Sequence, residues 1–166
     1  ADGLVLNKSV AFNAQLSNLH NIVFSPSLPL LNFAKRRDGV EKIVRDLAIK
    51  TQSIDMAVGQ LSGGNQQKVV IGRWLLRQPK VLILDEPTRG VDVGARAEIH
   101  RLVRDLALNG MAVIVISSEP DELPDLADRV LVMADGRIVK ELHGDALSRN
   151  AIVAASYATI ENNRTA

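Results

Sequence analysis

Two continuous apolar segments, VLILD (81–85) and AVIVIS (112–117), constrain the fold of this chain most. Uninterrupted apolar runs of this length are typical of strands that are covered on both faces. Between them, residues 93–108 repeat apolar side chains on one helical face and end at Asn109-Gly110, which predicts an amphipathic helix. A strand, a connecting helix and a second strand predict an α/β fold with a mostly parallel sheet flanked by helices.

The chain divides into a mainly helical part, residues 1–58, and a part over residues 61–144 in which helices and strands alternate. Residues 1–58 read as mainly helical, with Ser9 placed to cap one helix and with apolar residues of a second helix repeating on one face. Those repeating residues are Val40, Ile43, Val44 and Leu47. A helix over 63–77 precedes the first strand, and we expect its Trp74 in the core. The elements expected after the second strand are a short helix around 120–127 and strands at 131–134 and 137–142.

Composition excludes several classes of function. The formal net charge is +1 and five of the 166 residues are aromatic, which argues against sequence-independent binding of nucleic acid. The absence of cysteine excludes a disulfide scaffold and a thiolate metal site. The longest apolar runs are far shorter than the roughly 18 residues that a membrane-spanning helix needs.

The stretch LSGGNQQK (61–68) places a serine and two glycines where a helix is about to begin. Ser62 is positioned as an N-cap, in front of backbone N–H groups that have no partner within the helix. Gly63 and Gly64 have no side chains that would keep an anion away from those N–H groups. The stretch is therefore a candidate phosphate site. A serine-capped helix after a flexible turn is the alternative.

A second pattern, VLILDEP (81–87), ends a strand with two carboxylates, Asp85 and Glu86. Open α/β sheets bind ligands at this carboxyl edge. One carboxylate can hold Mg²⁺ and the next can orient and deprotonate an attacking water. A solvated strand end is the alternative for two adjacent acids, but here they follow Ser62 by 23 residues and precede PTRGVDVG, and that combination is specific.

Four motifs together resemble those of ABC transporter ATPases, which have a P-loop NTPase fold. LSGGNQQK is similar to their signature motif, VLILDEP to Walker B, RGVD (89–92) to the D-loop and the strand ending in ISSE (116–119) to the switch region. The residues of LSGGNQQK together with DEPTRGVDVGAR (85–96) also resemble the second nucleotide-binding half of ATPases that drive ribose, galactose and arabinose-type import. The resemblance implies part of the helical subdomain over 1–58, a RecA-like ATPase core over 59–144, and a C-terminal helix and polar tail over 145–166.

The resemblance also implies roles for individual residues. The implied nucleotide-binding segment, which would contact the γ-phosphate of ATP held by the opposite ATPase half, consists of Leu61, Ser62, Gly63, Gly64, Asn65 and Gln66. Asp85 would serve Mg²⁺, Glu86 the attacking water, and Asp92 communication between the two ATP sites. Ser118 stands where the family usually has the catalytic switch histidine, and serine cannot supply a cationic donor.

A departure from the family pattern limits what the chain is expected to do alone. No phosphate loop GxxxxGK[ST] is present, and the near miss DGLVLNKS (2–9) has Asn7 where glycine is needed. We therefore expect a truncated nucleotide-binding domain whose isolated 166 residues do not hydrolyse ATP. With Ser118 at the switch position, the segment 61–66 would complete a competent ATP site, while Asp85 and Glu86 would belong to a weaker one.

The implied parent protein is an ATP hydrolase that powers carbohydrate import from the cytoplasmic face of the membrane. The resemblance implies as its partners another ATPase half or a second copy, permease subunits and, indirectly, a periplasmic sugar-binding protein, but no nucleic acid. Two alternatives remain open. The C-terminal lobe of an SMC/Rad50-like ATPase should follow long heptads, which residues 1–33 lack. The other is a non-catalytic ABC-like interaction module. The sequence does not identify the sugar.

Overall fold

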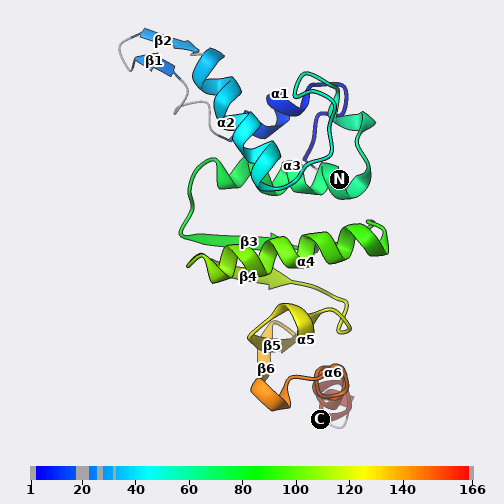
Figure 1. The fold of residues 1–166 in the computed structure, drawn as a ribbon. Coiled ribbons are helices and arrows are strands. Elements are labelled where there is room, and N and C mark those ends of the chain that lie inside the picture. Colours follow the sequence, from blue (N-terminus) through cyan, green and yellow to red (C-terminus); the bar gives the residue numbers. More distant parts are fainter. Residues whose placement is uncertain (1–2, 18–22, 26–27, 32, 165–166) are drawn as a thin grey trace. The chain divides into compact units, whose positions relative to one another are not determined.

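The computed structural model of the chain describes residues 3–17, 23–25, 28–31 and 33–164, in two compact units, Ala1–Ile114 and Val115–Ala166 (Figure 1). The helices and strands of the first unit are α1 (Val10–Gln15), β1 (Val23–Ser25), β2 (Leu28–Leu31), α2 (Phe33–Asp46), α3 (Gly63–Leu75), β3 (Val81–Asp85) and α4 (Val93–Leu108). The division between the units falls inside β4 (Ala112–Ile116). The second unit continues with α5 (Leu123–Leu126), β5 (Arg129–Ala134), β6 (Arg137–His143) and α6 (Arg149–Arg164).

Helices α1, α2 and α3 share one apolar core. The Oγ of Ser9 accepts a hydrogen bond from the Phe12 N–H at 3.0 Å, so the predicted cap of α1 is confirmed. The predicted apolar face of α2 is also confirmed, because Ile43 is buried in the core together with residues on either side of it. Gly72 lets α2 and α3 approach closely, since a Cβ at this position would lie 2.5 Å from Ile43 Cγ2. The core includes residues on both sides of position 58, and the subdomain boundary there stays a prediction.

Strands β3 and β4 form a two-stranded sheet, and their arrows run in the same direction in Figure 1. The bounds of β3 and α4 agree with the sequence prediction. The expectation that both faces of the strands are covered is not met among the described residues. Leu82 and Leu84 are buried, but Ile83 is 62% exposed and Ile114 of β4 is also exposed. An apolar run gives each strand two faces fit for burial, and the described residues cover only one.

Trp74 departs from its predicted place. Trp74 is 48% exposed, whereas Ile71, Gly72 and Arg73 just before it in α3 are buried. The buried face of α3 is therefore rotated away from the indole, and the expectation of a core tryptophan is wrong.

The second unit is built on the hairpin of β5 and β6, which pair antiparallel. Asp135 and Gly136 connect the strands with positive φ angles of 49° and 73°, the conformation of the tight turns that suit the twist of a hairpin. Ile152 of α6 packs with the buried residues of the hairpin. None of the described helices is long and apolar enough to cross a bilayer.

Candidate functional site

Helix α3, which carries the predicted signature segment at its start, begins without a side-chain cap. Ser62 has the extended backbone of an N-cap residue (φ −61°, ψ 156°), and its carbonyl oxygen accepts a hydrogen bond from the Gln66 N–H at 2.9 Å. The Ser62 hydroxyl, however, makes no bond to a backbone N–H of the first turn. Ser62 and Gly63 are both exposed. The first-turn N–H groups, at the positive end of the helix dipole, are thus not occupied by the serine and can bind an external acceptor.

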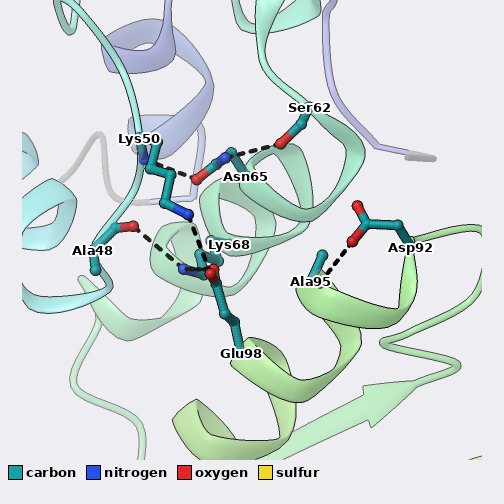
Figure 2. Close-up of polar contacts among 8 residues, drawn as sticks. All are labelled: Ala48, Lys50, Ser62, Asn65, Lys68, Asp92, Ala95 and Glu98. Carbon is teal, nitrogen blue, oxygen red and sulfur yellow. Dashed lines mark hydrogen bonds and ion pairs between the residues drawn. The ribbon is translucent and has the colours of Figure 1, made fainter.

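The Ser62 hydroxyl is instead held by Asn65, one turn later (Figure 2). Asn65 Nδ2 donates to Ser62 Oγ at 2.9 Å, and Asn65 Oδ1 accepts from the Lys50 N–H at 2.8 Å. A backbone N–H can only donate, so the Asn65 oxygen must face Lys50 and the amide nitrogen must face Ser62. Because Ser62 Oγ already accepts a hydrogen from Asn65, its own proton is left to donate to another group.

The two glycines of the motif have different structural environments. Gly63 is open: a Cβ there would have its nearest neighbour, Gly90 O, at 3.8 Å. Gly64 is buried, and a Cβ there would lie 2.3 Å from Ala95 Cβ on α4. The sequence analysis explained both glycines in the same way, by the access of an anion to the helix N–H groups. Gly64 has a second reason, because only glycine lets α3 and α4 come this close.

Asp92, the predicted D-loop residue, is the N-cap of α4. Its Oδ1 accepts from the Ala95 N–H at 2.9 Å, and its carbonyl oxygen accepts from the Arg96 N–H at 2.9 Å. Ala95 is also the residue that contacts Gly64. The predicted signature segment and the predicted D-loop residue are therefore brought together by the packing of the first turns of α3 and α4.

Sequence reasoning missed an ion-pair cluster formed by Lys68 of α3, Glu98 of α4 and Lys50, which lies in the connection after α2. Lys68 and Lys50 place their ammonium groups on the two carboxylate oxygens of Glu98, at 2.8 Å and 3.2 Å (Figure 2). Hydrogen bonds from Lys68 and then Lys50, together with their charges, lower the pKa of Glu98 from 4.5 to about 2. A signal was present in the motif itself: Lys68 lies on the helical face of Asn65, and a lysine on a buried face requires an acidic partner.

Asp85 and Glu86 end β3 with different geometries. Asp85 is exposed, and no hydrogen bond or ion pair of its carboxylate is formed with the described residues. The described residues contain no cluster of three or more His, Asp or Glu side chains that could hold a metal. One exposed carboxylate nevertheless suits Mg²⁺, which commonly takes one or two protein carboxylates and completes its shell with phosphate and water.

Glu86 has a backbone φ of +47°, in the left-handed region that favours glycine. Its carbonyl oxygen accepts from the Arg89 N–H at 3.2 Å in a turn whose Pro87 and Thr88 are fully buried. Non-glycine residues in this conformation cost about 1–3 kcal/mol and occur often at functional sites. The buried turn holds Glu86 in this strained conformation immediately after Asp85.

Ser118 lies in the second unit and is exposed. Beside it, Ser117 Oγ donates to the carboxylate of Glu122 and accepts from the Glu119 N–H at 3.0 Å. These bonds fix the segment that follows β4. The role of Ser118 together with Glu86 stays a prediction.

The chain matches a known protein family. The family model described as "ABC transporter" matches residues 3–89, which include the signature segment and the acidic pair. The chain belongs to the ABC transporter family. Within that family, it is 42% identical over 153 residues to the galactose/methyl galactoside import ATP-binding protein MglA of Sodalis glossinidius. It is 50% identical over 141 residues to a ribose import ATP-binding protein, RbsA 2, of Mesorhizobium japonicum.

These matches cover 92% and 85% of this chain but 30% and 27% of the two relatives. The chain therefore spans less than a third of their length. Two solved cassettes of ABC transporters share its fold. One, in its ADP conformation, has a TM-score of 0.73 and 27% identity over 95% of this chain and 64% of its own. A nucleotide-free cassette has a TM-score of 0.72 and 29% identity over 90% and 60%. The predicted ABC ATPase fold is confirmed.

Proposed function

We propose that this chain supplies the signature side of an ATP site in the ATP-hydrolysing subunit of a carbohydrate importer. The observation that carries the proposal is the start of α3, where Ser62 leaves the first-turn N–H groups uncapped and, held by Asn65, keeps its own proton for an external acceptor. A phosphate is an acceptor that fits such a helix end. The names of the sugar-import relatives support carbohydrate as the transported class.

In this proposal the signature segment binds the γ-phosphate of an ATP molecule held by the opposite ATPase half. The Ser62 hydroxyl and the N–H groups from Gly63 to Asn65 are the donors. Gln66 supports the segment from behind, because its Nε2 donates to the Leu61 carbonyl oxygen at 2.9 Å. Asp92, as the cap of the helix packed against Gly64, would transmit the state of one ATP site to the other.

The acidic pair would belong to the chain's own ATP site. Asp85 would hold Mg²⁺, which when bound neutralises charge on the transferred phosphate group. Glu86 would orient the attacking water and accept its proton. Ser118 would occupy the switch position without a cationic donor, so this site is the weaker of the two.

The proposed setting is a larger assembly at the cytoplasmic face of a membrane. ATP and Mg²⁺ are its ligands. Its partners are a second ATPase half or a second copy of the chain, permease subunits, and indirectly a periplasmic sugar-binding protein. A non-catalytic module, the competing hypothesis, would bind the same partners without any nucleotide-dependent change.

The decisive experiment is ATP turnover by the assembled importer with Ser62→Arg in this chain. The arginine side chain would fill the position proposed for the γ-phosphate, so sugar-stimulated hydrolysis should be abolished. Gln52→Arg, which adds the same charge at an exposed position of the same unit, should leave turnover unchanged. Glu86→Gln should do less harm than Ser62→Arg, and the reverse order would contradict the proposed asymmetry.

A second measurement addresses the chain alone. Because no phosphate loop is present in these 166 residues, they lack the backbone cradle and lysine that hold ATP phosphates. Neither hydrolysis nor micromolar ATP affinity is expected by calorimetry. Tight binding of ATP to the isolated chain would contradict the proposal that its signature segment acts on nucleotide held elsewhere.

A further inference from the structure

Lys68 is a buried cation within the signature helix. Its side chain is 5% exposed, and its ammonium group lies 2.8 Å from Glu98 Oε2 and donates to the Ala48 carbonyl oxygen at 3.3 Å. An ammonium group buried without a carboxylate is strongly unfavourable. Glu98 on α4 therefore holds α3 at this point along its length.

The second oxygen of the same carboxylate binds Lys50, and Lys50 is connected to Ser62 through Asn65. Glu98 Oε1 lies 3.2 Å from Lys50 Nζ, and the backbone N–H of Lys50 donates to Asn65 Oδ1 at 2.8 Å. Asn65 in turn donates to Ser62 Oγ at 2.9 Å. Figure 2 shows these contacts as one connected set that runs from Glu98 to the Ser62 hydroxyl. The backbone at Lys50 therefore orients the side-chain amide of Asn65, and this amide orients the Ser62 hydroxyl.

A third contact ties this set to the D-loop. Asp92 caps the helix that carries Glu98, and Ala95 of that helix packs on Gly64. The helix α4 therefore meets α3 at two levels, at the Gly64 contact and at the Lys68 ion pair. A helix held at two points cannot rotate about its axis without breaking one of them, so α3 and α4 are expected to move together.

We propose that Glu98 is a positioning residue for the ATP site, which through Lys68 and Lys50 fixes the signature segment to the helix that begins at Asp92. The proposal rests on the proposed function of that segment. Glu98 itself would make no contact with nucleotide. It acts by keeping the Ser62 hydroxyl and the first-turn N–H groups of α3 in the geometry that the γ-phosphate requires, without reorganisation when ATP binds.

The first test measures steady-state ATP turnover of the assembled importer with Glu98→Gln and with Lys50→Met. Glu98→Gln removes the charge that both lysines need, and we expect kcat to fall on the order of tenfold to a hundredfold. Because ATP is held by the opposite half, its KM should change little. Lys50→Met removes an exposed ammonium and buries no unpaired charge, so it tests the same chain of contacts in a protein whose folding is not at risk. Its kcat should fall less, in the same direction.

The matched control is Glu41→Gln, which removes the same charge but breaks an exposed ion pair between Glu41 and Arg37 within α2. Surface changes of this kind usually have small effects, so its kcat should stay within about twofold of the unaltered protein. A kcat for Glu98→Gln and Lys50→Met equal to that of Glu41→Gln overturns the proposal.

The second test follows hydrogen exchange of the backbone N–H groups at 62–66 in the full protein without nucleotide. Exchange should be faster in Glu98→Gln and Lys50→Met than in Glu41→Gln, because the segment is no longer fixed. Unchanged exchange in both variants overturns the proposal whatever the turnover shows. If the unaltered importer shows no sugar-stimulated hydrolysis, the proposed function fails, and the exchange result still decides whether Glu98 positions the segment.

Discussion

Gly64 of α3 and Ala95 of α4 meet so closely that a Cβ at Gly64 would lie 2.3 Å from the Ala95 Cβ. Ala95 also donates its N–H to Asp92 at 2.9 Å. Ala95 therefore takes part both in the packing of α3 against α4 and in the N-cap of α4. The position of the proposed phosphate-binding segment therefore depends on the absence of a side chain at Gly64.

Gly64→Ala should destabilise the protein by about 1–3 kcal/mol, because the new methyl group overlaps Ala95 in a packed contact. Glycine to alanine within a helix ordinarily stabilises by up to about 1 kcal/mol, so the sign of the effect is the test. Gly63→Ala, in open space, is the matched control and should not be destabilising. Chemical denaturation of both variants measures the difference.

The Gly64–Ala95 contact can be isolated by a double-mutant cycle. Ala95→Gly should relieve the overlap in the Gly64→Ala background and recover part of the lost free energy of unfolding, although it removes a good helix former. Additive effects of the two changes would show that the helices do not meet as described.

Much of the fold could be predicted because its signals are local. The strand 81–85 is a continuous apolar run, and the helix 93–108 has a capping aspartate in front and Asn109-Gly110 behind. The cap at Ser9 is likewise a property of a few adjacent residues. Exposure was harder to predict. Ile83 and Trp74 are exposed although both are apolar, since burial depends on which elements the chain supplies to cover a face.

The candidate site was predicted by position more than by mechanism. The motif locates Ser62 and Asn65, yet nothing local indicates that Asn65 takes the hydroxyl that would otherwise cap the helix. Lys68 and Glu98 are 30 residues apart, and their pairing depends on how two helices align when they pack. A glutamate within an amphipathic helix is typical of a solvated face, so the sequence pattern gave Glu98 no special role.

Asp92 offers a separation of its capping role from any role in catalysis. Asp92→Asn keeps an oxygen that can accept from the Ala95 N–H, whereas Asp92→Ala removes it and should cost about 1 kcal/mol of stability. If Asp92 acts only as a cap, Asn should restore both stability and ATP turnover. A variant with restored stability and lost turnover would show that ATP turnover needs the carboxylate charge of Asp92 in addition to its role as a cap.

Glu86 allows a direct measurement of backbone strain at the acidic pair. At its φ of +47°, a residue with a Cβ costs roughly 1–2 kcal/mol relative to glycine. Glu86→Gly should therefore be at least as stable as Glu86→Ala, despite the greater entropy of glycine in the unfolded chain. Ala97→Gly on the exposed face of α4 is the control and should destabilise by about 1 kcal/mol. Thermal unfolding of the three variants gives the comparison, and a Glu86→Gly protein less stable than Glu86→Ala would argue against strain.

The Glu98 ion-pair cluster predicts a specific dependence of stability on pH. Hydrogen bonds from Lys68 and Lys50 and their charges lower the pKa of Glu98 from its ordinary value of 4.5 to about 2 in the folded protein. The folded state therefore binds this proton more weakly than the unfolded state, and the stabilisation from Glu98 is fully present above pH 4.5 and is lost as the pH falls from 4.5 to about 2.

Glu98→Gln cannot titrate and should be less stable than the unaltered protein near neutral pH. Denaturation midpoints of the two proteins, measured from pH 6 downward, should converge as the pH approaches 2, because a protonated Glu98 resembles glutamine. If the difference between the two midpoints stayed constant over the whole pH range, it would contradict the lowered pKa of Glu98. It would also remove the electrostatic basis for the ion pair that joins α3 and α4.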